Sequence, residues 1–177
     1  MPRREGISVR ISPGEIAARV EELARDIHDA MPVDTLAVPV LTGSFVFAAD
    51  LIRALARAGA DWPLDFVTLS SYGAGTESSG TVRVTRDLTL PVAGRTVLLI
   101  DDILDTGRTL AFARDLLLER GATSVKLCAL LDKPARRSAT IEADFAGFSV
   151  SDEFLVGYGL DHDGRHRGLS YIGVVET

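Results

Sequence analysis

The sequence predicts an α/β fold built on a doubly wound parallel sheet. Apolar runs that suit strands buried on both faces alternate with amphipathic stretches that suit helices. Polar and glycine-containing turns separate these stretches at the spacing of strand–helix units. The 177 residues contain neither an internal repeat nor a long linker. We therefore expect residues 1–177 to form a single domain around one hydrophobic core.

The chain is expected to begin with a short strand and a helix. Residues 7–11 alternate apolar and polar side chains, as a short strand does. Ser12-Pro13-Gly14-Glu15 is typical of a capping box with proline at the first helical position. The apolar residues of the helix that should follow share one face: Ile16, Val20, Leu23 and Ile27.

The next strand–helix unit contains one unusual residue. A core strand is expected over residues 35–41, although Pro39 fits poorly inside it because proline cannot donate to the ladder. After a turn at residues 42–44, a helix is expected over residues 45–58, with Gly59 as its stop.

The middle of the chain should contribute three strands. Residues 64–70 and 82–88 have strand-like patterns, and residues 71–80 between them are rich in glycine and serine and should form a mobile loop. Residues 97–100 are a continuous apolar run that leads into Asp101 and Asp102.

The last third should start with a helix over residues 109–120 that ends at Gly121. Leu110, Ala113, Leu117 and Leu118 are its expected inward side chains. A buried strand should follow over residues 124–131. Shorter strand-like pieces are expected near three ranges: 145–150, 153–159 and 171–175.

The segment from residue 97 to residue 110 carries the clearest chemistry. Its acids lie at the carboxyl end of a predicted strand, which is where ligands bind in open α/β sheets. The N–H groups at the start of the next helix favour an anion such as phosphate, and paired carboxylates suit sugar hydroxyls or a hydrated metal. Aspartates at strand ends are also common as turn formers and helix caps. The chain contains no Gly-x4-Gly-Lys-Ser/Thr sequence, which excludes a nucleotide-triphosphate P-loop.

Composition excludes several classes of protein. A net charge of −6 argues against an extended nucleic-acid surface. The N-terminus shows no signal peptide, and no apolar run reaches the roughly 20 residues that span a bilayer. We expect a soluble, cytoplasmic protein that binds neither membrane nor nucleic acid. Cys128 should be a buried apolar residue, and the three histidines show no zinc-ligand spacing.

The full pattern Asp-Asp-x-x-Asp-Thr-Gly-x-Thr over residues 101–109 resembles the phosphoribosyl-pyrophosphate motif of the type I phosphoribosyltransferases. Four further segments narrow the resemblance to the hypoxanthine-guanine phosphoribosyltransferases. These segments are Leu41-Thr42-Gly43-Ser44-Phe45, Ser70-Ser71-Tyr72-Gly73, Leu130-Leu131-Asp132-Lys133-Pro134, and the run from Asp152 to Asp161.

The resemblance implies a purine-salvage reaction. A 6-oxopurine base, hypoxanthine or guanine, would attack the anomeric carbon of phosphoribosyl pyrophosphate, giving IMP or GMP and pyrophosphate. The implied fold is a parallel sheet with helices on both faces and a small hood from terminal segments, with residues 145–161 in the hood. Family members also imply a homodimer or a homotetramer.

The resemblance gives the motif residues separate roles. Asp101 and Asp102 match the acidic pair that contacts the ribose and magnesium. Asp105 matches the proton acceptor at purine N7, while a helix cap is its structural alternative. The 5′-phosphate would be held by the next four residues: Thr106, Gly107, Arg108 and Thr109.

Residues after the motif match the purine and magnesium sites. Lys133 would donate to the purine O6, and because an ammonium has no acceptor it should disfavour adenine. Phe154 would stack on the base, although by pattern alone it suits the core better. Leu155 would contribute backbone groups to the base edge. Asp161 matches a residue of the purine site that coordinates a second magnesium.

The pyrophosphate site shows a departure from the family. Arg167 matches a pyrophosphate contact, and Gly43 and Ser44 would supply backbone N–H groups. Thr42 stands where the family commonly has lysine, so the pyrophosphate contact should be weaker or shared with Arg167. The resemblance also implies a cis peptide at Leu41–Thr42.

Two further features concern the loop over the site and its rim. His162 replaces a frequent tyrosine, with no predicted consequence. Ser71 and Tyr72 match the signature of the loop that closes over the site; a flexible hairpin connection is the alternative.

Two other functional classes are compatible with parts of the sequence. One is a phosphoribosyltransferase that prefers xanthine or a pyrimidine. The other is a non-catalytic regulator that senses phosphoribosyl pyrophosphate. Asp105 and Lys133 argue against the regulator, as does the lack of a basic or helix-turn-helix segment.

Overall fold

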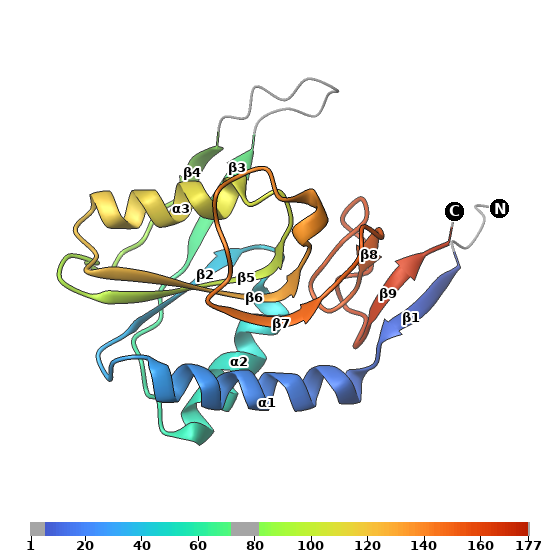
Figure 1. The fold of residues 1–177 in the computed structure, drawn as a ribbon, viewed down its shortest axis with the longest axis horizontal. Helices are drawn as coiled ribbons and strands as arrows, with labels where there is room; N and C mark the ends of the chain where they lie inside the picture. Colours follow the sequence, from blue (N-terminus) through green and yellow to red (C-terminus); the bar gives the residue numbers. More distant parts are fainter. Residues whose placement is uncertain (1–5, 72–81, 177) are drawn as a thin grey trace.

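The computed structural model describes residues 6–71 and 82–176 (Figure 1). Strands and helices alternate along these residues as the sequence predicts. The first half contains β1 (Ile7–Ile11), α1 (Pro13–Ala30), β2 (Leu36–Leu41), α2 (Phe45–Ala58), β3 (Val67–Ser71) and β4 (Val82–Arg86). The second half contains β5 (Thr96–Leu104), α3 (Arg108–Glu119), β6 (Ser124–Asp132), the 3-10 turn η1 (Pro134–Arg136), β7 (Phe145–Ser149), β8 (Leu155–Val156) and β9 (Ile172–Val175).

The main sheet has six strands in the order β4-β3-β2-β5-β6-β7, and only β4 is antiparallel to its neighbour. Helices α1 and α2 cover one face and α3 covers the other (Figure 1). Each face packs its own apolar cluster against the sheet. This arrangement confirms the predicted α/β fold with a mostly parallel sheet.

A second, three-stranded sheet in the order β1-β9-β8 forms the hood. It lies beside the carboxyl edge of the main sheet, and the described ends of the chain meet there (Figure 1). The predicted extent of the hood is wrong in one respect. Residues 145–149 form β7, which pairs in parallel with β6 in the main sheet, so the hood takes only β8 from this part of the chain.

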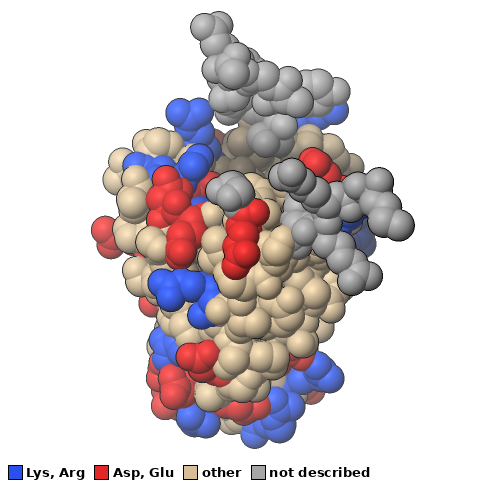
Figure 2. Space-filling view, turned by 90° about the vertical axis from the view of Figure 1, so that its right-hand side faces the viewer, with Lys and Arg blue, Asp and Glu red and all other residues tan. Residues whose placement is uncertain are grey.

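On the hood side, the described residues form no broad basic area (Figure 2). Figure 2 looks at this side and shows acidic and basic side chains interspersed among uncharged ones. In the described ranges 6–71 and 82–176, no helix is long and apolar enough to cross a membrane.

Helix α1 follows the predicted capping box. The Ser12 side chain accepts a hydrogen bond from the Glu15 N–H, and the Glu15 carboxylate accepts one from the Ser12 N–H at 2.8 Å. The predicted apolar face of the helix is buried. Helix α2 likewise ends at Gly59, whose φ of 105° is in the left-handed region that glycine tolerates.

Pro39 lies inside β2, an interior strand. Ala37 exchanges hydrogen bonds with Pro63 and Asp65 on the β3 side, so Pro39, two residues later, turns its nitrogen to that side too. Pairing there is interrupted between the Ala37–Leu64 bridge and the Val40–Val67 pair. The missing N–H therefore falls where the ladder is already broken.

Two side chains in the second half of the chain, Leu118 and Cys128, test the predicted core. Leu118 is 43% exposed, which makes its predicted inward position wrong, because the buried stripe of α3 runs through Leu110, Ala113 and Leu117. Cys128 is fully buried as predicted, and this burial raises the pKa of its thiol far above the usual range.

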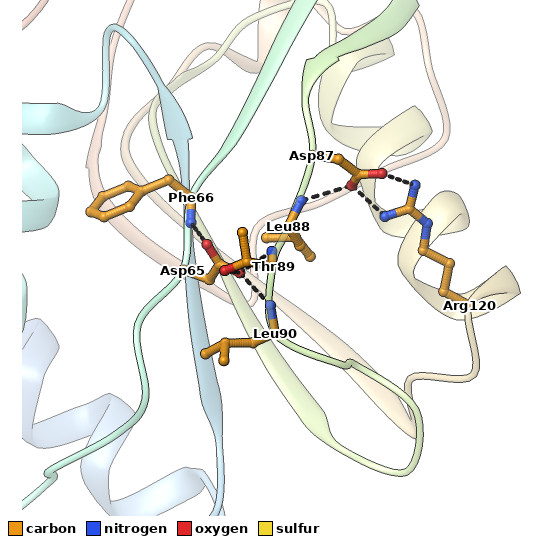
Figure 3. Close-up of polar contacts among 7 residues, drawn as sticks. All are labelled: Asp65, Phe66, Asp87, Leu88, Thr89, Leu90 and Arg120. Atoms are coloured by element: carbon orange, nitrogen blue, oxygen red, sulfur yellow. Dashed lines mark hydrogen bonds and ion pairs between the residues drawn. The ribbon is translucent and has the colours of Figure 1, made fainter.

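Asp65 ties the segment before β3 to the loop after β4 (Figure 3). Its carboxylate is 5% exposed and accepts hydrogen bonds from the N–H groups of Phe66 (2.8 Å), Thr89 (2.6 Å) and Leu90 (2.7 Å). Burial by itself would raise the pKa of Asp65, but these hydrogen bonds outweigh it and lower the pKa below its usual value.

We expect Asp65→Asn to destabilise the fold by about 1–3 kcal/mol at pH 7, because the amide cannot accept from N–H groups on both of its ends. A carboxylate with a lowered folded pKa stabilises above its unfolded pKa of about 3.9 and loses this effect as pH falls through the folded pKa. The difference between the two proteins should therefore shrink below about pH 4. Urea unfolding at several pH values measures both effects.

Asp87→Asn is the matched control for this variant. Asp87 lies in the loop after β4 and accepts a hydrogen bond from Arg120 Nη2 at 2.8 Å (Figure 3). The Asp87 side chain, however, is half exposed. An exposed ion pair contributes about 1 kcal/mol or less, so this variant should stay near wild-type stability. Equal losses for the two variants would show that burial of Asp65 is not the cause.

Candidate functional site

A cavity of about 250 Å³ lies where β5 ends and α3 begins. It gathers most of the residues of the predicted motif. Its lining consists of Asp101, Asp102, Ile103, Asp105, Thr106, Gly107, Thr109 and Leu110. Arg108 is exposed and lies outside the lining. Larger hollows of the surface lie elsewhere, but the acidic residues and the phosphate-binding residues predicted from sequence converge on this cavity.

Asp101 and Asp102 lie near the carboxyl end of β5 and are followed in the strand by Ile103 and Leu104. The strand therefore includes the acids and does not end before them. Burial raises the pKa of Asp101 well above its usual value, and the neighbouring Asp102 charge raises it further. Burial also raises the pKa of Asp102. Two desolvated carboxylates side by side favour the binding of a cation that also contacts the ligand. Because all of their donor atoms are oxygens, they fit magnesium.

The described residues bring no group of three or more His, Cys, Asp or Glu side chains together at a metal-binding spacing. Asp161 is instead paired with Arg167, at 2.6 Å. Magnesium commonly takes only one or two carboxylates and completes its shell with water and phosphate oxygens. The acidic pair therefore fits such an ion without a third protein ligand.

The turn before α3 presents free N–H groups to the cavity. Within the described residues, the N–H groups of residues 106–109 donate no hydrogen bond, as at any helix N-terminus. Gly107 caps the helix with a φ of 82°, and a Cβ there would collide with Ile141. Because no side chain caps α3, the alternative role of Asp105 as a helix cap is wrong.

Asp105 carries one buried carboxylate oxygen. Its Oδ1 accepts no hydrogen bond from the described residues, although Arg136 Nε lies 3.0 Å away as an ion pair. A carboxylate that lies beside an anion-binding turn is a candidate for proton transfer.

The loop between β2 and α2 packs against the acidic pair. The Leu41–Thr42 peptide is cis, as the resemblance implies. Gly43 packs so tightly on Asp102 that a Cβ would overlap the carboxylate, and Gly159 packs in the same way on the Gly43 carbonyl. Behind this loop the Ser44 hydroxyl donates to the Val40 carbonyl at 2.5 Å.

Arg167 lies in the segment after β8 and contacts two other residues of that segment. Its guanidinium donates to the Gly159 carbonyl at 2.6 Å and pairs with Asp161. Its charge also acts on Asp102, where it opposes part of the rise in that residue's pKa. Gly43 thus contacts Asp102 directly, and Arg167 acts on Asp102 through its charge while it pairs with Asp161.

The third side of the site combines a buried lysine and an exposed aromatic ring. Lys133, at the end of β6, is buried, and its Nζ donates to the Glu153 carbonyl at 2.6 Å. Phe154 is 54% exposed, so the alternative that it belongs to the core is wrong. The ring of His162 lies edge-on to Phe154 at 5.0 Å.

Leu155 is buried in β8, the edge strand of the hood sheet. One side of this strand pairs with β9, which leaves the backbone groups of its other side available to a ligand. Ser71 ends β3, and Tyr72 and the rest of the predicted loop lie outside the described residues.

Comparison with known proteins agrees with this geometry. The phosphoribosyl transferase domain matches residues 12–163. The hypoxanthine-guanine phosphoribosyltransferase of Bacillus subtilis is 45% identical over 95% of this chain and 92% of its own length. The chain belongs to the phosphoribosyltransferase family, in its hypoxanthine-guanine branch.

Two further relatives extend the comparison. The bifunctional protein TilS/HprT of Listeria innocua is 47% identical over 95% of this phosphoribosyltransferase, which spans only 26% of that longer protein. A crystal structure of a Bacillus anthracis hypoxanthine-guanine phosphoribosyltransferase superposes with a TM-score of 0.90 at 38% identity, covering 98% of this chain and 100% of the other.

Sequence reasoning missed two charged residues of this phosphoribosyltransferase site. Arg136 contacts Asp105, and Asp152 lies 3.5 Å from Arg136 and 3.6 Å from Lys133. The available signal was the position of Arg136 one turn after Lys133, in a Lys-Pro-Ala-Arg-Arg run. That run gives no indication that it folds back onto the start of α3.

Proposed function

We propose that the chain is a magnesium-dependent hypoxanthine-guanine phosphoribosyltransferase that acts in purine salvage. It transfers the phosphoribosyl group of phosphoribosyl pyrophosphate to N9 of hypoxanthine or guanine, giving IMP or GMP and pyrophosphate. The observation that carries this proposal is the single cavity that joins an acidic pair, an anion-binding helix start and Asp105. The named activities of the relatives support it.

The sugar phosphate is held by the motif itself. The 5′-phosphate lies on the free N–H groups and hydroxyls of residues 106–109, with the positive end of α3 behind it. Gly107 permits this close approach because no side chain intervenes. Asp101 and Asp102 accept hydrogen bonds from the ribose hydroxyls.

Asp101 and Asp102 would also hold magnesium through its water shell, and Asp161 would hold a second ion. Bound magnesium supplies positive charge that stabilises the pyrophosphate leaving group. Gly43 and Ser44 N–H groups and the Arg167 guanidinium contact the same pyrophosphate.

Transfer exchanges one bond at the anomeric carbon for another. The N9 lone pair of the base attacks C1′ as the bond from C1′ to the pyrophosphate oxygen breaks, and pyrophosphate leaves with that electron pair. The proton on N7 moves to the Asp105 carboxylate, which leaves the purine nucleotide neutral in its ring.

Recognition of the base rests on the third side of the site. The Lys133 ammonium has three donors, one of which the Glu153 carbonyl accepts, so another can reach the purine O6. Phe154 offers an exposed ring face for stacking, and the free edge of β8 at Leu155 offers backbone groups.

Thr42 gives the pyrophosphate loop a neutral side chain. We expect Thr42→Lys to tighten pyrophosphate binding by roughly five- to tenfold, since one more charged donor contributes about 1 kcal/mol or more. The inhibition constant of pyrophosphate as a product measures this effect. An unchanged constant would show that the loop binds pyrophosphate through its backbone alone.

The assembly and its partners follow as proposals. Phe45 and Leu64 are exposed apolar residues that line a hollow with Ile52 and Phe66, a surface that suits a second copy in a homodimer or homotetramer. We place the protein, as one domain over residues 1–177, in the cytoplasm with small-molecule substrates. The net charge of −6 does not suit nucleic acid or an anionic membrane.

Calorimetric titration with phosphoribosyl pyrophosphate tests the substrate site. Binding should be tight with magnesium and weakened at least tenfold by a chelator, because the acidic pair otherwise faces the substrate's own negative charge. Affinity that does not depend on magnesium would contradict the assigned role of Asp101 and Asp102.

A further inference from the structure

Four charged side chains link the proposed proton acceptor to the proposed purine lysine. Arg136 in η1 places its Nε 3.0 Å from Asp105 Oδ1 and its Nη1 3.5 Å from Asp152 Oδ1. Lys133 Nζ lies 3.6 Å from the same oxygen of Asp152. The charges therefore alternate in sign from Asp105 to Lys133, and the row is neutral as a whole.

The two oxygens of Asp105 have different surroundings. Oδ1 is buried under Arg136, yet the whole side chain is 39% exposed. The accessible surface therefore belongs to atoms of the side chain other than Oδ1. In the described part of the chain, no other side chain or N–H group forms a hydrogen bond or ion pair with this carboxylate. Without Arg136, no described residue would fix the rotation of the Asp105 carboxylate.

We propose that Arg136 is a positioning residue for phosphoribosyl transfer. Its guanidinium holds Oδ1 of Asp105 inward, so that Oδ2 faces N7 of the incoming purine. Asp152 holds Arg136 and Lys133 at a fixed spacing, which aligns the proton acceptor with the group that binds O6. The inference rests on the proposed role of Asp105 as proton acceptor.

If Arg136 had a purely structural role, its removal would lower the stability of the fold, whereas a positioning role predicts a loss of reaction rate. Arg136 is 47% exposed and Asp152 54%, and exposed ion pairs contribute little to stability. Removing Arg136 should therefore leave the melting temperature almost unchanged. Misplacement of a reacting group by about 1 Å, by contrast, costs up to about 100-fold in rate.

The test is the steady-state kinetics of Arg136→Gln. We expect kcat for hypoxanthine to fall by about 10- to 100-fold, with KM for phosphoribosyl pyrophosphate within about twofold of wild type. Arg136→Lys should recover part of the loss, because an ammonium keeps the charge without the planar fork. Arg25→Gln, on the exposed side of α1, removes the same charge far from the site and should have wild-type kcat.

A double variant separates this inference from the function on which it rests. In an Asp105→Asn background, Arg136→Gln should change kcat by less than about twofold, because the group to be positioned is gone. Wild-type kcat for Arg136→Gln, or the same loss in both backgrounds, would overturn the positioning role alone. Wild-type kcat for Asp105→Asn would instead overturn the role of Asp105 as proton acceptor.

Discussion

Asp105→Asn is expected to lower kcat by about 100- to 10,000-fold, the range typical of losing a general base. An amide of the same shape cannot accept the N7 proton. Affinity for phosphoribosyl pyrophosphate should change by less than about threefold, because the N–H groups of residues 106–109 and the acidic pair remain in place. Steady-state kinetics and calorimetric titration measure the two quantities.

Asp115→Asn provides the control for this variant. Asp115 lies on the exposed side of α3 and pairs with Arg114, so its replacement removes an acid from the same helix without touching the cavity. Asp105 itself lies just before α3, whereas Asp115 lies within it. Asp115→Asn should retain wild-type kcat. Parallel losses of kcat and of substrate affinity in Asp105→Asn would assign Asp105 to binding instead of proton transfer.

Lys133→Met is expected to lower kcat/KM for hypoxanthine by about 10- to 100-fold, because a hydrogen bond from a charged donor to a neutral oxygen contributes roughly 1.5–3 kcal/mol. Methionine keeps the apolar stem of the buried side chain. Affinity for phosphoribosyl pyrophosphate should not change, and discrimination against adenine should weaken, since the donor that disfavours the 6-amino group is gone.

Lys126→Met is a matched control in β6, the strand that ends one residue before Lys133. Lys126 pairs with Asp144 at 2.8 Å, and its side chain is 46% exposed. The change should leave kcat/KM for every base near wild type. If Lys133→Met lowered use of all bases equally, Lys133 would support the local structure without reading O6.

The order of strands and helices could be predicted because each depends on local patterns. Each of these patterns determines the structure of only the few residues around it. Examples are the capping box at Ser12, the helix stop at Gly59 and the apolar run before Asp101. The assignment of residues 145–149 to the hood failed for the opposite reason. A five-residue strand carries no mark of its partner, and its pairing with β6 is decided by tertiary packing.

The site divides in the same way. The motif over residues 101–109 is contiguous, so the convergence of most of its residues on one cavity follows from the strand–turn–helix connection. The exposure of Phe154 could not be predicted from the local pattern, because an aromatic residue in an apolar segment usually belongs to the core; only the family resemblance indicated an accessible ring. The Asp105–Arg136 contact joins residues far apart in sequence, and no local pattern encodes such an ion pair.

Turnover on a panel of bases tests the central claim most directly. The purified protein, phosphoribosyl pyrophosphate and magnesium are mixed with hypoxanthine, guanine, xanthine, adenine or uracil, and nucleotide and pyrophosphate formation are followed. We expect IMP and GMP to form rapidly, with adenine at least 1,000-fold poorer, as expected when a buried donor is left without its acceptor. Activity confined to uracil or xanthine, or no activity with any base, would contradict the assignment to hypoxanthine and guanine.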